Sequence, residues 1–259
     1  MAPTRWILGN WKQHHLREAA ASCAQAIAAG AAQAVGGADV RVGIAPTFLA
    51  LDAAAPHCAP ATDVWLLAQD CAAQDGGAFT GEVGPAMLRE AGVRAVIVGH
   101  SERRAMFGDT DALVAAKLSH ALASGLSAVL CVGERLEARE AGDHESTVIS
   151  QLSAAFARVD SSVVGPSLVI AYEPVWAIGT GKTATPTQAS QMHATIRGWL
   201  AERFGGAGRD RSILYGGSVK PDNAAELIAA GDIDGFLVGG ASLDPQSFLA
   251  IVRAAAATA

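Results

Sequence analysis

The chain has 259 residues, 51% of them hydrophobic, and a formal net charge of −6 at pH 7. The acidic balance argues against a nucleic-acid or anionic-membrane partner, because such partners require a basic face on the protein. No apolar run reaches the roughly 18 residues that a membrane span needs. We therefore expect one large soluble domain over residues 1–259, in which any anionic ligand is held by a local site.

The four cysteines, Cys23, Cys58, Cys71 and Cys131, are widely spaced and form no C-x-x-C pair. This spacing predicts free, mostly buried thiols in a reducing compartment. Residues 1–9 contain one arginine but no long apolar stretch behind it, which argues against a signal peptide. The expected location is the cytoplasm.

Short apolar runs recur along the chain, and we interpret eight of them as strands. They lie at residues 6–8, 42–45, 64–67, 95–98, 128–131, 168–171, 213–215 and 236–238. None alternates apolar with polar residues, so each strand is expected to be buried on both faces, as parallel strands are.

Alanine-rich stretches between these runs have helical character. Three of them lie at residues 17–35, 109–125 and 185–204. The second begins with an Asp or Thr cap and ends at Gly125. In the third, Thr185 or Thr187 can cap the start while Pro186 occupies the first turn.

Eight strand–helix units with short connections predict a closed (β/α)8 barrel of the α/β class, with eight parallel strands ringed by helices. An open doubly wound sheet is the alternative, but no strand is followed by the G-x-G-x-x-G nucleotide fingerprint. The longest loops are expected at residues 70–83 and 174–182. In such barrels, functional residues lie at the carboxyl ends of the strands.

Polar and glycine residues follow five of the predicted strands. They are Asn10 and Lys12 after the first strand, His100 and Glu102 after the fourth, Glu173 after the sixth, residues 216–218 after the seventh and residues 239–240 after the eighth. A lone lysine here is usually just solvated, and a lone histidine is usually a core residue. A barrel, however, brings all of these groups to one rim, which favours a shared site.

Five segments carry a resemblance to a known family. They are G-N-W-K at residues 9–12, V-I-V-G-H-S-E-R-R at 96–104, A-Y-E-P-V-W-A-I-G-T-G-K-T-A at 171–184, Y-G-G-S-V at 215–219 and F-L-V-G-G-A-S-L at 236–243. They resemble triosephosphate isomerase, in the family's order, from Leu8 to about Phe248. The resemblance implies a TIM-barrel enzyme that interconverts dihydroxyacetone phosphate and D-glyceraldehyde 3-phosphate in glycolysis and gluconeogenesis.

This isomerisation moves a carbonyl along by one carbon, which requires a base to remove the proton beside it. Glu173 is the expected base, because it ends a buried strand and a glycine-bearing loop follows it. Negative charge then develops on the carbonyl oxygen of an enediolate and needs electrostatic stabilisation. His100 can donate a hydrogen bond, Lys12 can supply positive charge and Asn10 can add an amide donor.

The resemblance assigns further roles. It implies a neutral His100, a known feature of this family, because a short helix begins just after the imidazole and disfavours its charged form. It makes Glu102 an active-site acid near Lys12. The residues that correspond to the family's phosphate-binding positions are Gly179, Ser218, Gly239 and Gly240.

The loop at residues 175–181 is expected to close over the substrate, as the family's loop does, and to exclude water. Pro174 stiffens its first hinge and biases Glu173 toward an extended backbone. An ordinary surface loop is the alternative interpretation, which Trp176 and Ile178 beside a strand-end acid disfavour. Cys131 is expected to be a packing residue rather than a nucleophile.

The resemblance also implies a homodimer. In the family, the third loop inserts into a neighbouring subunit, where the residue matching Thr80 completes the partner's site near Lys12. A long glycine-bearing loop with an exposed Phe79 is unusual for a monomer, which agrees with this expectation. The family pattern further pairs Arg103 with Glu82. No metal and no organic cofactor is expected.

One departure follows Lys12, where residues 13–15 read Gln-His-His and the family commonly has Met and a small polar residue. This change leaves the interface and the substrate preference open. We expect the two histidines to be solvated rather than to share a metal ion, because adjacent helical residues point about 100° apart.

Three other functions remain to be weighed. The first is a related isomerase of a four-carbon ketose phosphate on the same scaffold, and the second is a barrel that only binds a partner. The third is a nucleotide binder, because G-T-G-K-T resembles the end of a Walker A loop. That motif, however, needs a glycine where Trp176 stands.

Overall fold

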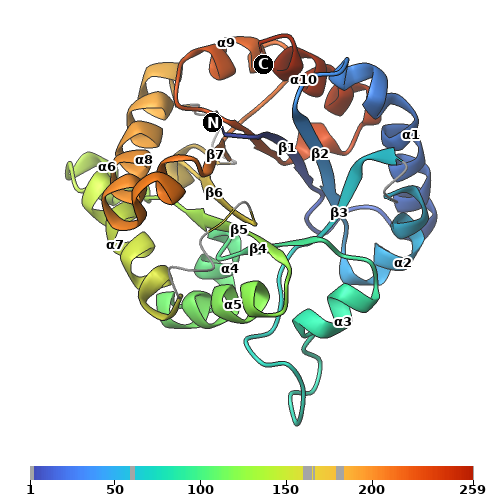
Figure 1. Ribbon diagram of the computed structural model, residues 1–259, viewed down its shortest axis with the longest axis horizontal. Helices are drawn as coiled ribbons and strands as arrows, with labels where there is room; N and C mark the ends of the chain where they lie inside the picture. The colour runs from blue at the N-terminus through green and yellow to red at the C-terminus, as the bar shows by residue number, and fades with distance from the viewer. Residues whose placement is uncertain (1–2, 59–61, 160–164, 166, 179–183, 259) are drawn as a thin grey trace.

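The computed structural model describes residues 3–58, 62–159, 165, 167–178 and 184–258. All eight predicted strands are present, and they close into one parallel barrel in chain order (Figure 1). The strands are β1 (Arg5–Asn10), β2 (Val40–Ala45), β3 (Val64–Ala68), β4 (Ala95–Val98), β5 (Ser127–Val132), β6 (Leu168–Tyr172), β7 (Ser212–Tyr215) and β8 (Gly235–Val238). The predicted (β/α)8 fold is confirmed.

Helices ring the barrel on its outside (Figure 1). They are α1 (Arg17–Val35), α2 (Leu51–Ala54), α3 (Pro85–Glu90), α4 (Ser101–Met106), α5 (Asp111–Ala123), α6 (Leu136–Glu140), α7 (His144–Ala155), α8 (Pro186–Arg209), α9 (Ala224–Ala229) and α10 (Pro245–Ala256). Short 3₁₀ turns lie at η1 (Phe48–Ala50), η2 (Ala55–His57), η4 (Phe156–Arg158), η6 (Val175–Ala177) and η7 (Gly240–Ser242). None of the described helices is long and apolar enough to cross a membrane.

The strands bury both of their faces, as their continuous apolar runs predict. Alternate side chains fill the interior of the barrel, among them Trp6, Leu8, Leu67, Ile97, Val129, Val169, Leu214 and Leu237. The residues between them point outward and pack against the helices in a second, larger apolar cluster. Full burial of a large apolar side chain stabilises the fold by about 1.5–3 kcal/mol, so this double core holds the strand ends in fixed positions.

The hydrogen-bonded ladders between neighbouring strands differ in length. Between β1 and β2 the register runs from Arg5 opposite Val40 to Asn10 opposite Ala45. Between β7 and β8 a single position, Tyr215 opposite Phe236, is paired. The ladder between β7 and β8, called the β7–β8 seam below, is therefore the shortest in the barrel.

Local signals set the helix boundaries. Thr185 caps α8 by accepting a hydrogen bond from the backbone N–H of Gln188, whose side chain bonds back to Thr185. This capping box selects Thr185 over Thr187 as the cap. The helix extends to Arg209, beyond its predicted end, across a kink at Gly205 where φ is 62°.

The third loop leaves the barrel between β3 and α3 and projects well beyond the ring of helices (Figure 1). Phe79 near its tip is 44% exposed. All four cysteines are free thiols and all are buried, as their spacing predicts.

Candidate active site

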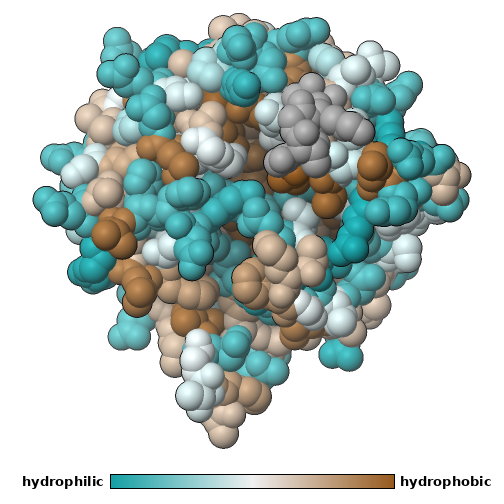
Figure 2. Space-filling model, turned by 180° about the vertical axis from the view of Figure 1, so that it is seen from behind, coloured by the Kyte–Doolittle hydropathy of each residue, from teal (hydrophilic) through white to brown (hydrophobic). Residues whose placement is uncertain are grey.

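A cavity of about 1190 Å³ lies at the carboxyl ends of the strands. The side of the molecule that is turned away in Figure 1 is hollowed near its middle (Figure 2). The predicted site residues that line the cavity are Asn10, Lys12, His100, Glu102, Glu173, Ser218, Gly239 and Gly240. Of the other two, Gly179 lies outside the described residues, and Thr80 does not line this cavity.

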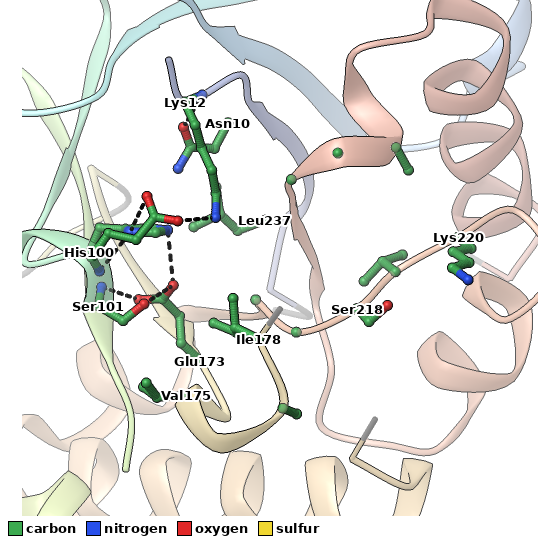
Figure 3. A pocket seen from close by; sticks show the side chains of 18 of the residues that line it. Asn10, Lys12, His100, Ser101, Glu173, Val175, Ile178, Ser218, Lys220 and Leu237 are labelled. Carbon is green, nitrogen blue, oxygen red and sulfur yellow. Dashed lines mark hydrogen bonds and ion pairs between the residues drawn. The ribbon is translucent and has the colours of Figure 1, made fainter. Parts of the chain in front are cut away.

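Lys12 enters the cavity from the end of β1. Its backbone is left-handed, with φ of 50°, which is uncommon for a residue other than glycine. The Lys12 N–H donates to Oδ1 of the buried Asn10 at 3.0 Å. The Lys12 ammonium forms an ion pair with the carboxylate of Glu102 (Figure 3). These contacts place the predicted acid beside the predicted cation.

His100 caps the short helix α4. Its Nδ1 accepts a hydrogen bond from the backbone N–H of Glu102 at 3.3 Å. Because Nδ1 accepts in this arrangement, Nε2 is the ring nitrogen placed to donate. The neutral His100 that the resemblance implies stays a prediction.

The carboxylate of Glu173 is buried, with 2% of its side chain exposed, and three donors surround it. Its Oε2 accepts the backbone N–H of Ser101 at 2.9 Å. Its Oε1 lies 3.1 Å from the Ser101 hydroxyl and 3.0 Å from His100 Nε2. Figure 3 shows the side chain pointing toward this pair and away from Ser218. A buried carboxylate needs such partners, and the amino end of a helix supplies one of them.

Close backbone approaches fix the position of Glu173. A Cβ added to Gly133 would lie 1.8 Å from the Glu173 carbonyl oxygen, so only glycine fits there. A Cβ on Gly216 would lie 3.0 Å from the Glu173 Cγ.

Cys131 lies beneath, completely buried, and burial together with the Glu173 charge raises the pKa of its thiol well above the usual range. A thiol held in this way stays protonated, which agrees with a packing role.

The start of the sixth loop is attached to a buried acid that the sequence analysis missed. Oε1 of Glu134 accepts the indole N–H of Trp176 at 2.8 Å and the hydroxyl of Tyr172 at 3.1 Å. Burial raises the pKa of Glu134. A strand-end position after β5 was its only sequence signal. Trp176 is thus part of a specific contact and not an ordinary surface residue.

Glycine turns follow β7 and β8 on the opposite side of the cavity. A Cβ on Gly217 would lie 2.2 Å from the Tyr215 hydroxyl oxygen, so this turn requires glycine. Gly240 opens the turn η7, and the Lys12 Cε lies 3.8 Å from the position of a Cβ on Gly239. Lys220, which was not predicted, also lines this side (Figure 3). The arrangement leaves space for an anion between Lys12 and the two turns.

His193 on α8 was not predicted either, because no local sequence pattern marks it. It is buried between the rings of Tyr172 and Tyr215, with centroid distances of 5.8 Å and 6.5 Å. Its Nδ1 lies 3.0 Å from the carbonyl oxygen of Asp232. Burial lowers the pKa of His193 to about 4, so the ring is neutral near pH 7.

The expected pairing of Arg103 with Glu82 is wrong within this chain. The Nε of Arg103 lies 2.8 Å from Asp70 and 3.2 Å from Asp109. Lys117 contacts both of these carboxylates as well. These two acids are buried beside the guanidinium, whereas Glu82 lies exposed on the third loop, so the nearer and less hydrated partners are preferred.

The two histidines after Lys12 are not simply a solvated pair. His14 is exposed, but His15 is half-buried and packs edge-on against Trp11, with a centroid distance of 5.0 Å. His15 also has a left-handed backbone, with φ of 64°. Within the described part of the chain, no group of three metal-ligating side chains could hold an ion.

Comparisons with known proteins agree with this geometry. The family model described as triosephosphate isomerase matches residues 5–255. A triosephosphate isomerase of Halorhodospira halophila is 49% identical over 251 residues, covering 96% of this chain and 97% of the relative. That of Paracidovorax citrulli is 48% identical over 257 residues (99% and 100%), and that of Chlorobium phaeovibrioides is 47% identical over 250 residues (96% and 98%).

Proposed function

The chain belongs to the triosephosphate isomerase family, and from this membership we propose how its own residues carry out the reaction. It is an intramolecular aldose–ketose isomerase that interconverts dihydroxyacetone phosphate and D-glyceraldehyde 3-phosphate through an enediolate, in glycolysis and gluconeogenesis. One observation carries the assignment of roles. The Glu173 carboxylate, the His100 Nε2–H and the Lys12 ammonium converge in one cavity at the strand ends.

In the proposed mechanism, Glu173 takes a proton from the carbon beside the substrate carbonyl and returns it to the neighbouring carbon. The proton of the substrate hydroxyl passes to the former carbonyl oxygen in the same reaction, relayed by the His100 Nε2. The carboxylate must first leave Ser101, whose N–H and hydroxyl both donate to it. The proton is thus held on Glu173 between the two transfers, and no outside acid or base is consumed.

The developing oxyanion is stabilised by neighbouring groups of different kinds. His100 donates from Nε2, because its Nδ1 is already occupied as an acceptor. Lys12 supplies a full positive charge, and Asn10 contributes its side-chain amide. Glu102 orients the Lys12 ammonium through the ion pair. Such fixed dipoles and charges stabilise the transition state without a reorganisation cost.

The phosphate group is proposed to bind Ser218, Gly239, Gly240 and Gly179, of which the last lies outside the described residues. Glycine turns allow the backbone N–H groups to approach an anion closely. The whole chain carries a net charge of −6, so attraction of a phosphate must come from local groups such as Lys12.

The sixth loop is proposed as a lid that covers the bound substrate. Its described start, Val175–Ala177, borders the cavity, and Trp176 is bonded to Glu134. Closure would shield the enediolate from water and so prevent loss of its phosphate.

A homodimer is the proposed assembly, with Thr80 completing the partner's site near Lys12. Large apolar side chains are exposed in the described chain, among them Phe79 on the third loop, and Figure 2 shows brown surface beside the projecting tip of this loop. These residues are Leu16, Phe48, Leu49, Phe79, Met87, Met106 and Phe107. Leu16 and Leu49 are 87% and 82% exposed, and a partner surface that covered them would stabilise the assembly. We propose a cytoplasmic location, without nucleic-acid or membrane partners.

The test of the proposed function is a coupled assay with glyceraldehyde 3-phosphate, with a four-carbon ketose phosphate assayed in parallel. We expect kcat/KM near the diffusion ceiling of about 10⁸ M⁻¹s⁻¹ on the three-carbon substrate. Activity should persist in chelator, because no metal takes part. Strong activity on the four-carbon substrate alone would instead support the related isomerase, and inactivity on both would restore the binding-scaffold interpretation.

A further inference from the structure

The backbone of Lys12 needs external support. At φ of 50° it lies in the left-handed region. For any residue with a Cβ atom this conformation is unfavourable, so the surrounding structure must stabilise it. The Asn10 side chain holds the N–H of this residue, as described above. The carbonyl of Lys12 is held by another side chain, that of Gln69, which no motif contains.

Gln69 follows β3 directly and donates from one amide nitrogen to two carbonyl oxygens. Its Nε2 lies 2.8 Å from the oxygen of Lys12 and 2.9 Å from that of Ala45. Because both partners are acceptors, the amide can be oriented in only one way. The Ala45 oxygen also accepts the N–H of Trp11 at 3.1 Å. One half-buried side chain therefore joins the carboxyl ends of β1, β2 and β3 directly below Lys12.

We propose that Gln69 is a positioning residue for the reaction, which keeps Lys12 in its left-handed conformation so that the ammonium reaches Glu102 and the anion space beside Gly239. The inference rests on the proposed role of Lys12. If Gln69 cannot donate, the Lys12 peptide loses the bond to its carbonyl, and rotation about φ would swing the side chain away. A displacement of about 1 Å at a reacting group can cost about 10²-fold in rate.

A purely structural role is the competing explanation, since the same two bonds also tie three strands together. The two explanations differ in how the effect depends on Lys12. A positioning residue acts through the Lys12 ammonium, so its removal should matter little once that ammonium is absent. If Gln69 only stabilises the rim, its removal should lower kcat/KM by the same factor whether or not the Lys12 ammonium is present.

The experiment is a double-mutant cycle of Gln69→Met with Lys12→Ala, measured as kcat and KM for glyceraldehyde 3-phosphate. Methionine keeps the length of the side chain and removes both donors. We expect Gln69→Met alone to lower kcat/KM by about 10-fold to 100-fold, with a raised KM and a lowered kcat. In the Lys12→Ala background the same change should cost less than about 2-fold.

Ser212→Ala is the matched control. The Ser212 hydroxyl donates to the carbonyl of Thr4 at 2.7 Å, at the opposite end of the barrel. This change also removes a bond between a side chain and the backbone, so it should lower the melting temperature while leaving kcat/KM unchanged. If Gln69→Met is not folded at the assay temperature, Gln69→Leu takes its place, because it keeps most of the side-chain volume and has no hydrogen-bond donor.

Equal fold losses in the two backgrounds would overturn the positioning role while leaving the proposed function intact. Unchanged kcat/KM in folded Gln69→Met would overturn it as well. Normal turnover in Lys12→Ala alone would contradict the proposed function itself, so the two failures are distinguishable.

Discussion

Glu173 is held at the amino end of α4 by an N–H, a hydroxyl and an imidazole N–H, all within 3.1 Å. These donors compensate the burial of a charge that would otherwise be costly. The carboxylate must leave the Ser101 donors to reach the substrate, and its reach is set by the length of the side chain. The reaction therefore depends on the length of this side chain as well as on its charge.

Glu173→Asp should lower kcat by about 10²-fold or more while leaving KM nearly unchanged. The shorter side chain withdraws the carboxylate by one methylene from the carbon that it must deprotonate. Steady-state kinetics on glyceraldehyde 3-phosphate measures both constants. Glu226→Asp, the same change at an exposed position on α9, should behave as the unmodified enzyme. Normal turnover in Glu173→Asp would remove Glu173 from the role of base.

His193 should make stability depend on pH. Its ordinary pKa near 6.5 falls to about 4 in the folded chain, so between these values only the unfolded chain binds the proton. The contribution of His193 to the free energy of unfolding is therefore greatest above pH 6.5. It decreases by about 3 kcal/mol in total as the pH falls toward 4.

Urea unfolding at pH 7.5 and pH 5 measures this loss, with His193→Phe as the comparison because it keeps a ring that cannot titrate. Buried carboxyls with raised pKa values, Asp70, Glu134 and Asp234, contribute the opposite slope in both proteins and cancel in the difference. An equal pH dependence in the two proteins would contradict the assignment.

Among the elements, α8 shows how local chemistry sets a boundary. It begins directly after the last residues of the sixth loop, and its capping box is made by Thr185 and Gln188. The cap satisfies backbone N–H groups that the first helical turn leaves free.

Thr185→Ala should reduce the free energy of unfolding by about 1 kcal/mol and the melting temperature by about 2–4 °C. Thermal unfolding checks this, and Thr187→Ala is the control because that exposed threonine makes no cap. A larger loss from Thr187→Ala than from Thr185→Ala would show that the cap has been misassigned.

The elements themselves were largely predictable. Each of the eight apolar runs became a strand, because parallel strands in a closed barrel must be apolar on both faces. The stretch at 17–35 became α1 with the predicted bounds. The end of α8 was not predictable, because Gly205 kinks the helix and would normally end it.

The site was predictable where a residue ends a strand, as Asn10, His100 and Glu173 do, because the barrel fixes where strand ends meet. Gln69, Glu134 and His193 were missed. Their importance lies in which distant atoms they contact, and no local pattern records that. The pairing of Arg103 was misjudged for the same reason, since the acids that reach it come from separate loops.

At the scale of the whole molecule, the third loop projects beyond the ring of helices and carries the exposed Phe79, which supports the proposed dimer interface. Lys12, the residue that Gln69 supports, is expected to lie against the partner's Thr80. Assembly and activity are therefore expected to depend on one another.

Phe79→Asp should shift the protein from dimer to monomer and lower kcat, because a charge cannot be buried in the interface without a partner. Sedimentation velocity at micromolar concentration, combined with the coupled assay, tests this. Ala257→Asp adds the same charge near the C-terminal end, where residue 257 is exposed, and should leave both measurements unchanged. A fully active monomer would disprove the dependence.

The short seam between β7 and β8 has a consequence for how the barrel opens. Tyr215 opposite Phe236 is the one paired position here, so we expect the barrel to open between β7 and β8 more readily than between strands with longer ladders. The glycine turns proposed to grip the phosphate follow these same two strands, one on each side of the seam. A bound anion that contacts both turns would therefore hold β7 and β8 together. Amide hydrogen exchange in β7 and β8 should slow markedly when inorganic phosphate is added, while exchange in β2 should not. The ligand would then stabilise the shortest ladder of a barrel that is already closed without it.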